Sequence, residues 1–130
     1  MITTSKTKHC QYIFSAIELT GQQYINAYQN LNLTCNATGP LRAPEVIDWF
    51  HEGNVIDERK RQWRNRVTFT YFLPEIPGRS LISQLTLERV QFEDAGIYVC
   101  RSSTPSLNND VETTSLNVHV LGGRFIYNNL

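Results

Sequence analysis

The stretch Leu85–Cys100 reads LTLERVQFEDAGIYVC, and it begins with apolar side chains at every second position. Leu85 and Leu87 alternate with Thr86 and Glu88. The same period of two recurs at residues 31–35, 67–71 and 116–120. Strict alternation indicates a strand with one buried face and one solvent-exposed face, which is typical of antiparallel sheets. No long window carries apolar residues at helical spacing, so the chain is predicted to be all-β.

Turn signals rich in glycine and proline separate the alternating segments, at residues 38–40, 52–54, 77–78 and 104–105. We therefore predict nine strands, at residues 11–19, 23–27, 30–37, 45–51, 54–58, 66–72, 80–88, 96–103 and 112–121. Many short strands at this spacing indicate a sandwich or a barrel.

The composition narrows the class of protein. The chain has 130 residues with 12 basic and 12 acidic side chains, 41% apolar residues and 18% charged ones. This is a globular composition of one domain, and its neutral balance argues against a general nucleic-acid binder. No apolar run approaches the ~18 residues of a membrane-spanning helix. The N-terminal residues lack a signal-peptide pattern, so we expect a secreted form to have lost its leader upstream of this numbering.

The three cysteines, Cys10, Cys35 and Cys100, permit one bridge and one leftover thiol. A Cys35–Cys100 bridge closes a loop of about 65 residues, worth about 4 kcal/mol in the chain-entropy model. Three reduced cysteines in a cytosolic protein are the alternative, and the count alone does not separate the two.

Residues 85–100 closely resemble the strand E to strand F signature of the immunoglobulin superfamily. Leu31-x-Leu33-x-Cys35 is similar to strand B of that family, and the segment Ile47–Phe50 to strand C. The resemblance implies an immunoglobulin-like antiparallel β-sandwich of intermediate-set or variable type, with two sheets and Greek-key connections. The domain is then expected at residues 11–121, with an N-terminal extension at 1–10 and a C-terminal tail or linker at 122–130.

The resemblance also assigns structural roles. It implies a Cys35–Cys100 disulfide with Trp49 packed against it, and a tyrosine corner at Tyr98. Gly96 lets the chain turn into strand F without a Cβ clash. The remaining structural residues are Leu87 in the core and an Arg66–Asp94 ion pair that closes one end of the sandwich.

A disulfide implies an oxidising compartment, so the resemblance favours a secreted protein or the ectodomain of a cell-surface protein. An intracellular muscle-type domain is the alternative. Cys10 has no partner in the family pattern. It is either a free thiol, a thiol whose partner lies outside this segment, or the link of a covalent dimer.

Two N-glycosylation signals begin at Asn32 and Asn36. Both asparagines alternate with inward residues, so both are expected to face solvent. Glycans here would lie on the sheet that contains strand B. A protein interface is then expected on the opposite sheet, formed by strands C, F and G.

Residues 58–66 contain five basic side chains among nine, with one tryptophan. Clustered cations and planar guanidinium groups bind sulfate, so we predict a sulfated-glycan contact. The candidate residues are Arg59, Lys60, Arg61, Trp63 and Arg64. The alternative is a solvated loop in which Arg66 pairs with Asp94 and Trp63 packs onto the sheet.

Catalysis has little support in the sequence. The three histidines, His9, His51 and His119, are scattered, and no nucleophile, metal-ligand or cofactor-binding motif occurs. No cofactor, catalytic residue or metal ligand is predicted. The resemblance implies an extracellular recognition module that binds a protein in cell adhesion, receptor binding or neuronal wiring, or as a secreted ligand. The alternatives are an accessory domain of a larger extracellular enzyme or receptor kinase, and a heparan-sulfate-binding matrix module.

Overall fold

A computed structural model describes residues 15–74, 78–106 and 111–122 of the chain. The described residues form nine strands and one short 3-10 helix, η1. In chain order these are β1 (Ala16–Gly21), β2 (Tyr24–Asn26), β3 (Leu31–Thr38), β4 (Val46–His51), β5 (Asn54–Val55), β6 (Val67–Phe72), β7 (Ser80–Leu87), η1 (Phe92–Asp94), β8 (Gly96–Ser103) and β9 (Val111–Leu121). Cys10 and His9 lie outside the described residues, as do the first residues of the strand predicted at 11–19.

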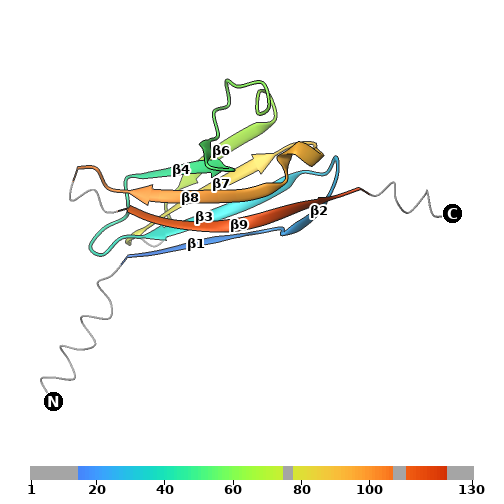
Figure 1. Cartoon of the computed structure of the whole chain (residues 1–130). Helices are drawn as coiled ribbons and strands as arrows, with labels where there is room; N and C mark the ends of the chain where they lie inside the picture. The colour runs from blue at the N-terminus through green and yellow to red at the C-terminus, as the bar shows by residue number, and fades with distance from the viewer. Residues whose placement is uncertain (1–14, 75–77, 107–110, 123–130) are drawn as a thin grey trace, which may run out of the picture.

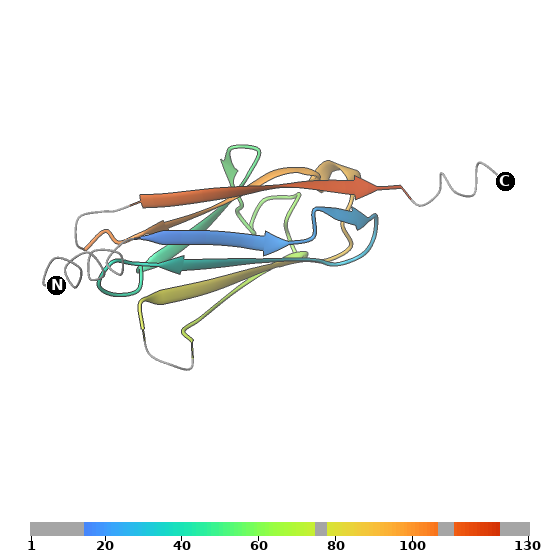
Figure 2. The same cartoon turned by 90° about the horizontal axis from the view of Figure 1, so that it is seen from below.

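The strands form two sheets that pack face to face (Figures 1 and 2). The four-stranded sheet has the order β1-β3-β7-β6, and the five-stranded sheet has the order β2-β9-β8-β4-β5. The chain crosses from the four-stranded sheet to the five-stranded sheet between β3 and β4. As a result, β3 pairs with β7 in the first sheet and β4 pairs with β8 in the second. The predicted all-β sandwich is confirmed. In both views β1 begins at one end of the sandwich and β9 ends at the other.

The first two strands belong to different sheets. β1 pairs antiparallel with β3, whereas β2 pairs parallel with β9. Gly21 makes the change of sheet possible, with a φ of 154° that side chains rarely allow. A Cβ at this position would lie 2.5 Å from Leu33 Cδ2. Glycine is therefore required where the chain leaves one sheet for the other.

The core lies between the inner faces of the sheets. On β3 the side chains of Leu31, Leu33 and Cys35 are fully buried, as the alternating pattern predicted. Cys35 forms the predicted disulfide with Cys100, which joins β3 of one sheet to β8 of the other. Leu87 is also fully buried, on the four-stranded sheet.

Trp49 lies beside the disulfide, because its cross-strand partner in the β4–β8 pair is Cys100. Its ring is 2% exposed, and its indole N–H donates to Ser83 Oγ at 2.9 Å. Ser83 is on β7, so this hydrogen bond connects the two sheets. It also explains a fully buried serine in the core, since a buried indole N–H needs an acceptor.

Candidate functional site

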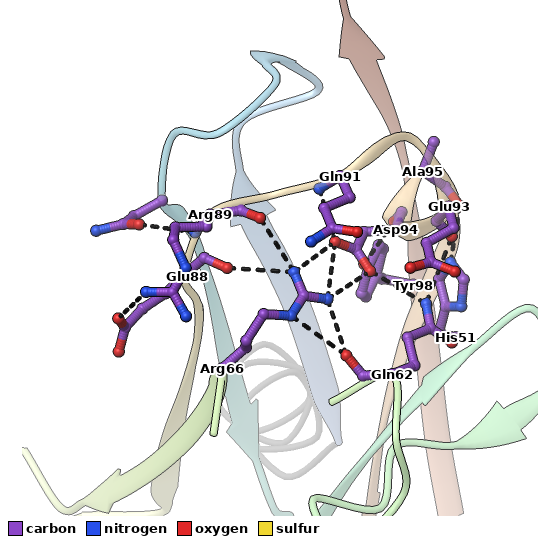
Figure 3. A network of polar contacts seen from close by, with 11 residues as sticks. His51, Gln62, Arg66, Glu88, Arg89, Gln91, Glu93, Asp94, Ala95 and Tyr98 are labelled. Carbon is purple, nitrogen blue, oxygen red and sulfur yellow. Dashed lines mark hydrogen bonds and ion pairs between the residues drawn. The ribbon is translucent and has the colours of Figure 1, made fainter. Parts of the chain in front are cut away.

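One end of the sandwich is closed by a buried polar network around Arg66 and Asp94 (Figure 3). The Arg66 guanidinium contacts both carboxylate oxygens of Asp94 at 2.9–3.0 Å. It also donates to the backbone carbonyl oxygens of Gln62, Glu88 and Arg89. Hydrogen bonds to Asp94 raise the pKa of Arg66. Arg66 thus ties three chain segments together while its charge is balanced by Asp94.

Tyr98 and His51 complete this network. The Tyr98 hydroxyl donates to the Asp94 carbonyl oxygen at 2.6 Å, which is the tyrosine corner that the resemblance implied. Burial, and next the charge of Asp94, raise the pKa of Tyr98. His51 Nε2 lies 2.7 Å from the Ala95 carbonyl oxygen, so Nε2 carries the hydrogen.

Gly96 is the glycine of this corner, with a φ of 127°. A Cβ on Gly96 would lie 2.5 Å from Glu52 Oε2, whose carboxylate accepts the Ile97 N–H. The expected role of Gly96 in the turn therefore has two causes, the backbone angle and the approach of Glu52.

The polar network is structural. Among the described residues, no buried side-chain nitrogen or oxygen lacks a hydrogen-bond partner. The described ranges also contain no group of three His, Cys, Asp or Glu side chains able to hold a metal ion.

Tyr98→Phe is expected to lower the free energy of unfolding by about 1 kcal/mol, because it removes one buried hydrogen bond and keeps the ring. Urea denaturation followed by tryptophan fluorescence measures the change. An unchanged unfolding midpoint would show that the hydroxyl contributes nothing to the corner.

The predicted glycosylation sites lie on β3, in the middle of the four-stranded sheet. Asn32 and Asn36 are both exposed, on the outer face of that sheet. Asn32 Oδ1 accepts a hydrogen bond from Thr86 Oγ1 at 2.9 Å. Modification of either asparagine stays a prediction.

The basic segment, residues 58–66, contains both exposed and buried candidate residues. Arg59, Lys60, Arg61 and Arg64 are exposed, as a glycan contact requires. Trp63, in contrast, is 5% exposed and belongs to the core, with its ring edge-on to His51 at 5.3 Å. The placement of Trp63 among the candidate glycan-binding residues is therefore wrong, and the alternative, in which Trp63 packs onto the sheet, holds. Within residues 58–66, Arg66 and Trp63 therefore stabilise the sandwich.

The outer face of the five-stranded sheet is the predicted C–F–G surface, formed by β4, β8 and β9. Cross-strand pairing brings outward residues into two rows. We call these six residues the recognition face: Asp48, Arg101 and Thr113 in one row, and Phe50, Val99 and Ser115 in the next. None of them is fully buried.

Arg101 is the centre of the recognition face. Its guanidinium carbon lies 4.8 Å from the centre of the Phe50 ring, and Nη2 lies 3.1 Å from Asp48 Oδ2. Arg101 and Asp48 remain 42% and 37% exposed. A guanidinium that is stacked and paired keeps one geometry while its outer surface stays available, so less conformational entropy is lost when a partner binds.

The sequence reasoning placed the interface on this sheet but did not identify Asp48, Phe50 and Arg101. The signal was present, since Asp48 and Phe50 flank the inward Trp49, and Arg101 follows the inward Cys100. Alternation alone therefore puts all three outside.

Two comparisons relate this architecture to known proteins. A comparison with curated proteins finds no significant match. Within the described ranges, no helix is long and apolar enough to cross a membrane. The family model of the immunoglobulin domain matches residues 21–113, which span the strands from β2 to β8, the Cys35–Cys100 disulfide and the closed corner. The chain belongs to the immunoglobulin domain family.

Proposed function

We propose that this protein is an extracellular recognition module that binds a protein partner through the recognition face. Immunoglobulin domains commonly bind proteins, and the family is generally non-enzymatic. A domain of this family with an intrachain disulfide is typical of extracellular proteins. Cell adhesion, receptor binding and action as a secreted ligand are the roles that fit such a module.

The observation that carries the proposal is the stacked and paired Arg101. Interface hot spots are enriched in arginine and aromatic side chains surrounded by contacts that exclude water. The same sheet exposes apolar side chains, among them Val55 opposite Phe50 on the edge strand β5, 54% exposed, and Ile97 further along β8, 47% exposed. An aromatic ring, a guanidinium and exposed apolar side chains on one sheet match the composition of an interface core.

The two glycosylation signals support this choice of sheet. Asn32 and Asn36 lie on the outer face of the four-stranded sheet. A glycan on either residue would cover that surface and leave the recognition face open. The protein partner is therefore expected on the five-stranded sheet.

The double variant Phe50→Ala/Arg101→Ala is expected to weaken partner binding by about 2 kcal/mol or more, because it removes the centre of the face. A screen of the purified domain against extracellular proteins identifies the partner, and surface plasmon resonance measures the Kd. The matched control is Phe72→Ala/Arg89→Ala, which removes the same residue types away from the recognition face, where Phe72 is 50% exposed.

The control variant is expected to bind like the wild type. Equal loss of affinity in both variants, or loss in the control alone, would contradict the assignment of the interface to the five-stranded sheet.

A further inference from the structure

A second surface feature lies at the β4–β5 hairpin, where β5 forms the edge of the five-stranded sheet. It is a hollow of about 740 Å³. One wall is the hairpin, with His51, Glu52, Asn54 and Val55, and the other wall is residues 60–63. Residues 60–63 belong to the β5–β6 connection, which stands out from the sandwich before leading into β6 (Figure 1).

The cations of this connection differ in how they are balanced. Arg59 donates through Nε and Nη2 to the two carboxylate oxygens of Asp57, both at 3.0 Å. These hydrogen bonds lower the pKa of Asp57 to about 2. Lys60 and Arg61 are exposed and take part in none of the ion pairs found within the described ranges. The hollow is therefore lined by two cations without an ion pair and by one carboxylate, that of Glu52, so its lining carries a net positive charge.

The backbone of the connection is held in place. Asp57 Oδ1 accepts the Arg59 N–H, and the Asp57 carbonyl oxygen accepts the Lys60 N–H, each at 2.9 Å. The Lys60 carbonyl oxygen accepts the N–H groups of Trp63 and Arg64 at 3.1 and 2.9 Å. Because the buried Trp63 ring anchors this turn, Lys60 and Arg61 start from a fixed backbone, which lowers the entropic cost of binding.

The rest of the hollow is mainly polar. Glu52, Asn54 and Gln62 supply carboxylate and amide oxygens that can accept hydrogen bonds from hydroxyl groups. Val55 is the exposed apolar side chain of the wall, since Trp63 is almost completely buried. A polar wall with two cations suits a ligand that combines hydroxyl groups with strong anions.

We propose that this hollow binds a sulfated saccharide, with a sulfate group on Lys60 and Arg61 and sugar hydroxyls on the oxygens of Asn54 and Gln62. The guanidinium of Arg61 matches the oxygens of a sulfate in a bidentate contact, and Lys60 adds a point charge. Arg64 extends the positive surface, because its guanidinium donates to the Arg59 carbonyl oxygen and to no carboxylate within the described ranges. Arg59 is already paired with Asp57 and Trp63 is buried. We therefore exclude both from the residues proposed to bind the saccharide.

The test is isothermal titration of the domain with a heparin tetrasaccharide at low salt, since exposed charges are screened within about 10 Å at 0.1 M ionic strength. Lys60→Ala/Arg61→Ala is expected to weaken binding at least about tenfold, through the loss of two charge-assisted contacts. The matched control, Arg42→Ala/Arg89→Ala, removes the same net charge from two surface ion pairs elsewhere. It is expected to keep the wild-type affinity.

Two further probes define the ligand class. A desulfated tetrasaccharide keeps the sugar chain and its carboxylates, and a polyglutamate peptide of similar charge keeps only negative charge. Both are expected to bind much more weakly than the sulfated probe. Circular dichroism checks that the variants remain folded, as expected for substitutions of exposed side chains.

Three results would overturn the proposal. They are no binding of the heparin probe by the wild type, an equal loss in the two double variants, and equal binding of a desulfated or peptide probe. The recognition face contains neither Lys60 nor Arg61, so failure here leaves the proposed protein interface untouched.

Discussion

Arg66→Met is expected to lower the free energy of unfolding by about 3–5 kcal/mol, because it leaves a buried carboxylate without its cation. The Asp94 side chain is 1% exposed, and Arg66 supplies three of its charge-assisted hydrogen bonds. The substitution also removes the hydrogen bonds that the carbonyl oxygens of Glu88 and Arg89 accept from Arg66. Chemical denaturation at neutral pH measures the effect.

The matched control for this prediction is Arg89→Met. Arg89 pairs with Glu88 at 3.3 Å, but the two side chains are 59% and 47% exposed. A surface pair of this kind contributes at most about 1 kcal/mol. A loss of similar size in the two variants would mean that burial does not make the Arg66–Asp94 pair special.

Trp49→Ala is expected to cost about 3–5 kcal/mol of stability, because it opens a cavity beside the disulfide. It also removes the hydrogen bond that Ser83 accepts from the indole N–H. Trp49→Phe keeps most of the volume and is expected to cost less. Calorimetric melting of the wild type and both variants measures the two contributions.

If Trp49→Ala left the melting temperature unchanged and abolished partner binding, Trp49 would be a binding residue and its core assignment would be wrong.

The sandwich could be read from the sequence because burial in it follows a period of two. Leu31, Leu33 and Cys35 lie inside, as their alternation predicted. The corner was accessible through the family signature, which identified Arg66 and Asp94. The signature did not show that Arg66 also donates to three backbone carbonyl groups. Those of Glu88 and Arg89 belong to a segment that only folding brings close to Arg66, whereas that of Gln62 belongs to the local turn.

The basic segment shows where sequence reasoning stops. Its residues form consecutive turns, so neither alternation nor helical spacing says which side chains point inward. The pattern therefore could not decide whether Trp63 lies at the surface or in the core, which is settled by its contact with His51 at the end of β4. The neutralisation of Arg59 has a local origin, because Asp57 precedes it by two residues and accepts its backbone N–H.

The recognition face required the register between strands. Alternation places Asp48 and Arg101 outside, but only the pairing of β4 with β8 makes them neighbours. A shift of one residue would put a different pair together and turn Arg101 inward. Register, which depends on the whole sheet, is the information that the sequence pattern lacked.

A glycan placed on the recognition face tests the proposed function most directly. Thr113→Asn completes a glycosylation signal with Ser115 on β9, and Thr113 is exposed in the row of Arg101. Thr68→Asn completes one with Thr70 on the exposed side of β6, in the four-stranded sheet. Both variants are expressed in secreting cells, their glycans are verified by mass, and their affinity for the partner is measured. The account predicts that the glycan at position 113 abolishes binding and that the glycan at position 68 does not. Undiminished binding with a verified glycan at position 113 would contradict it.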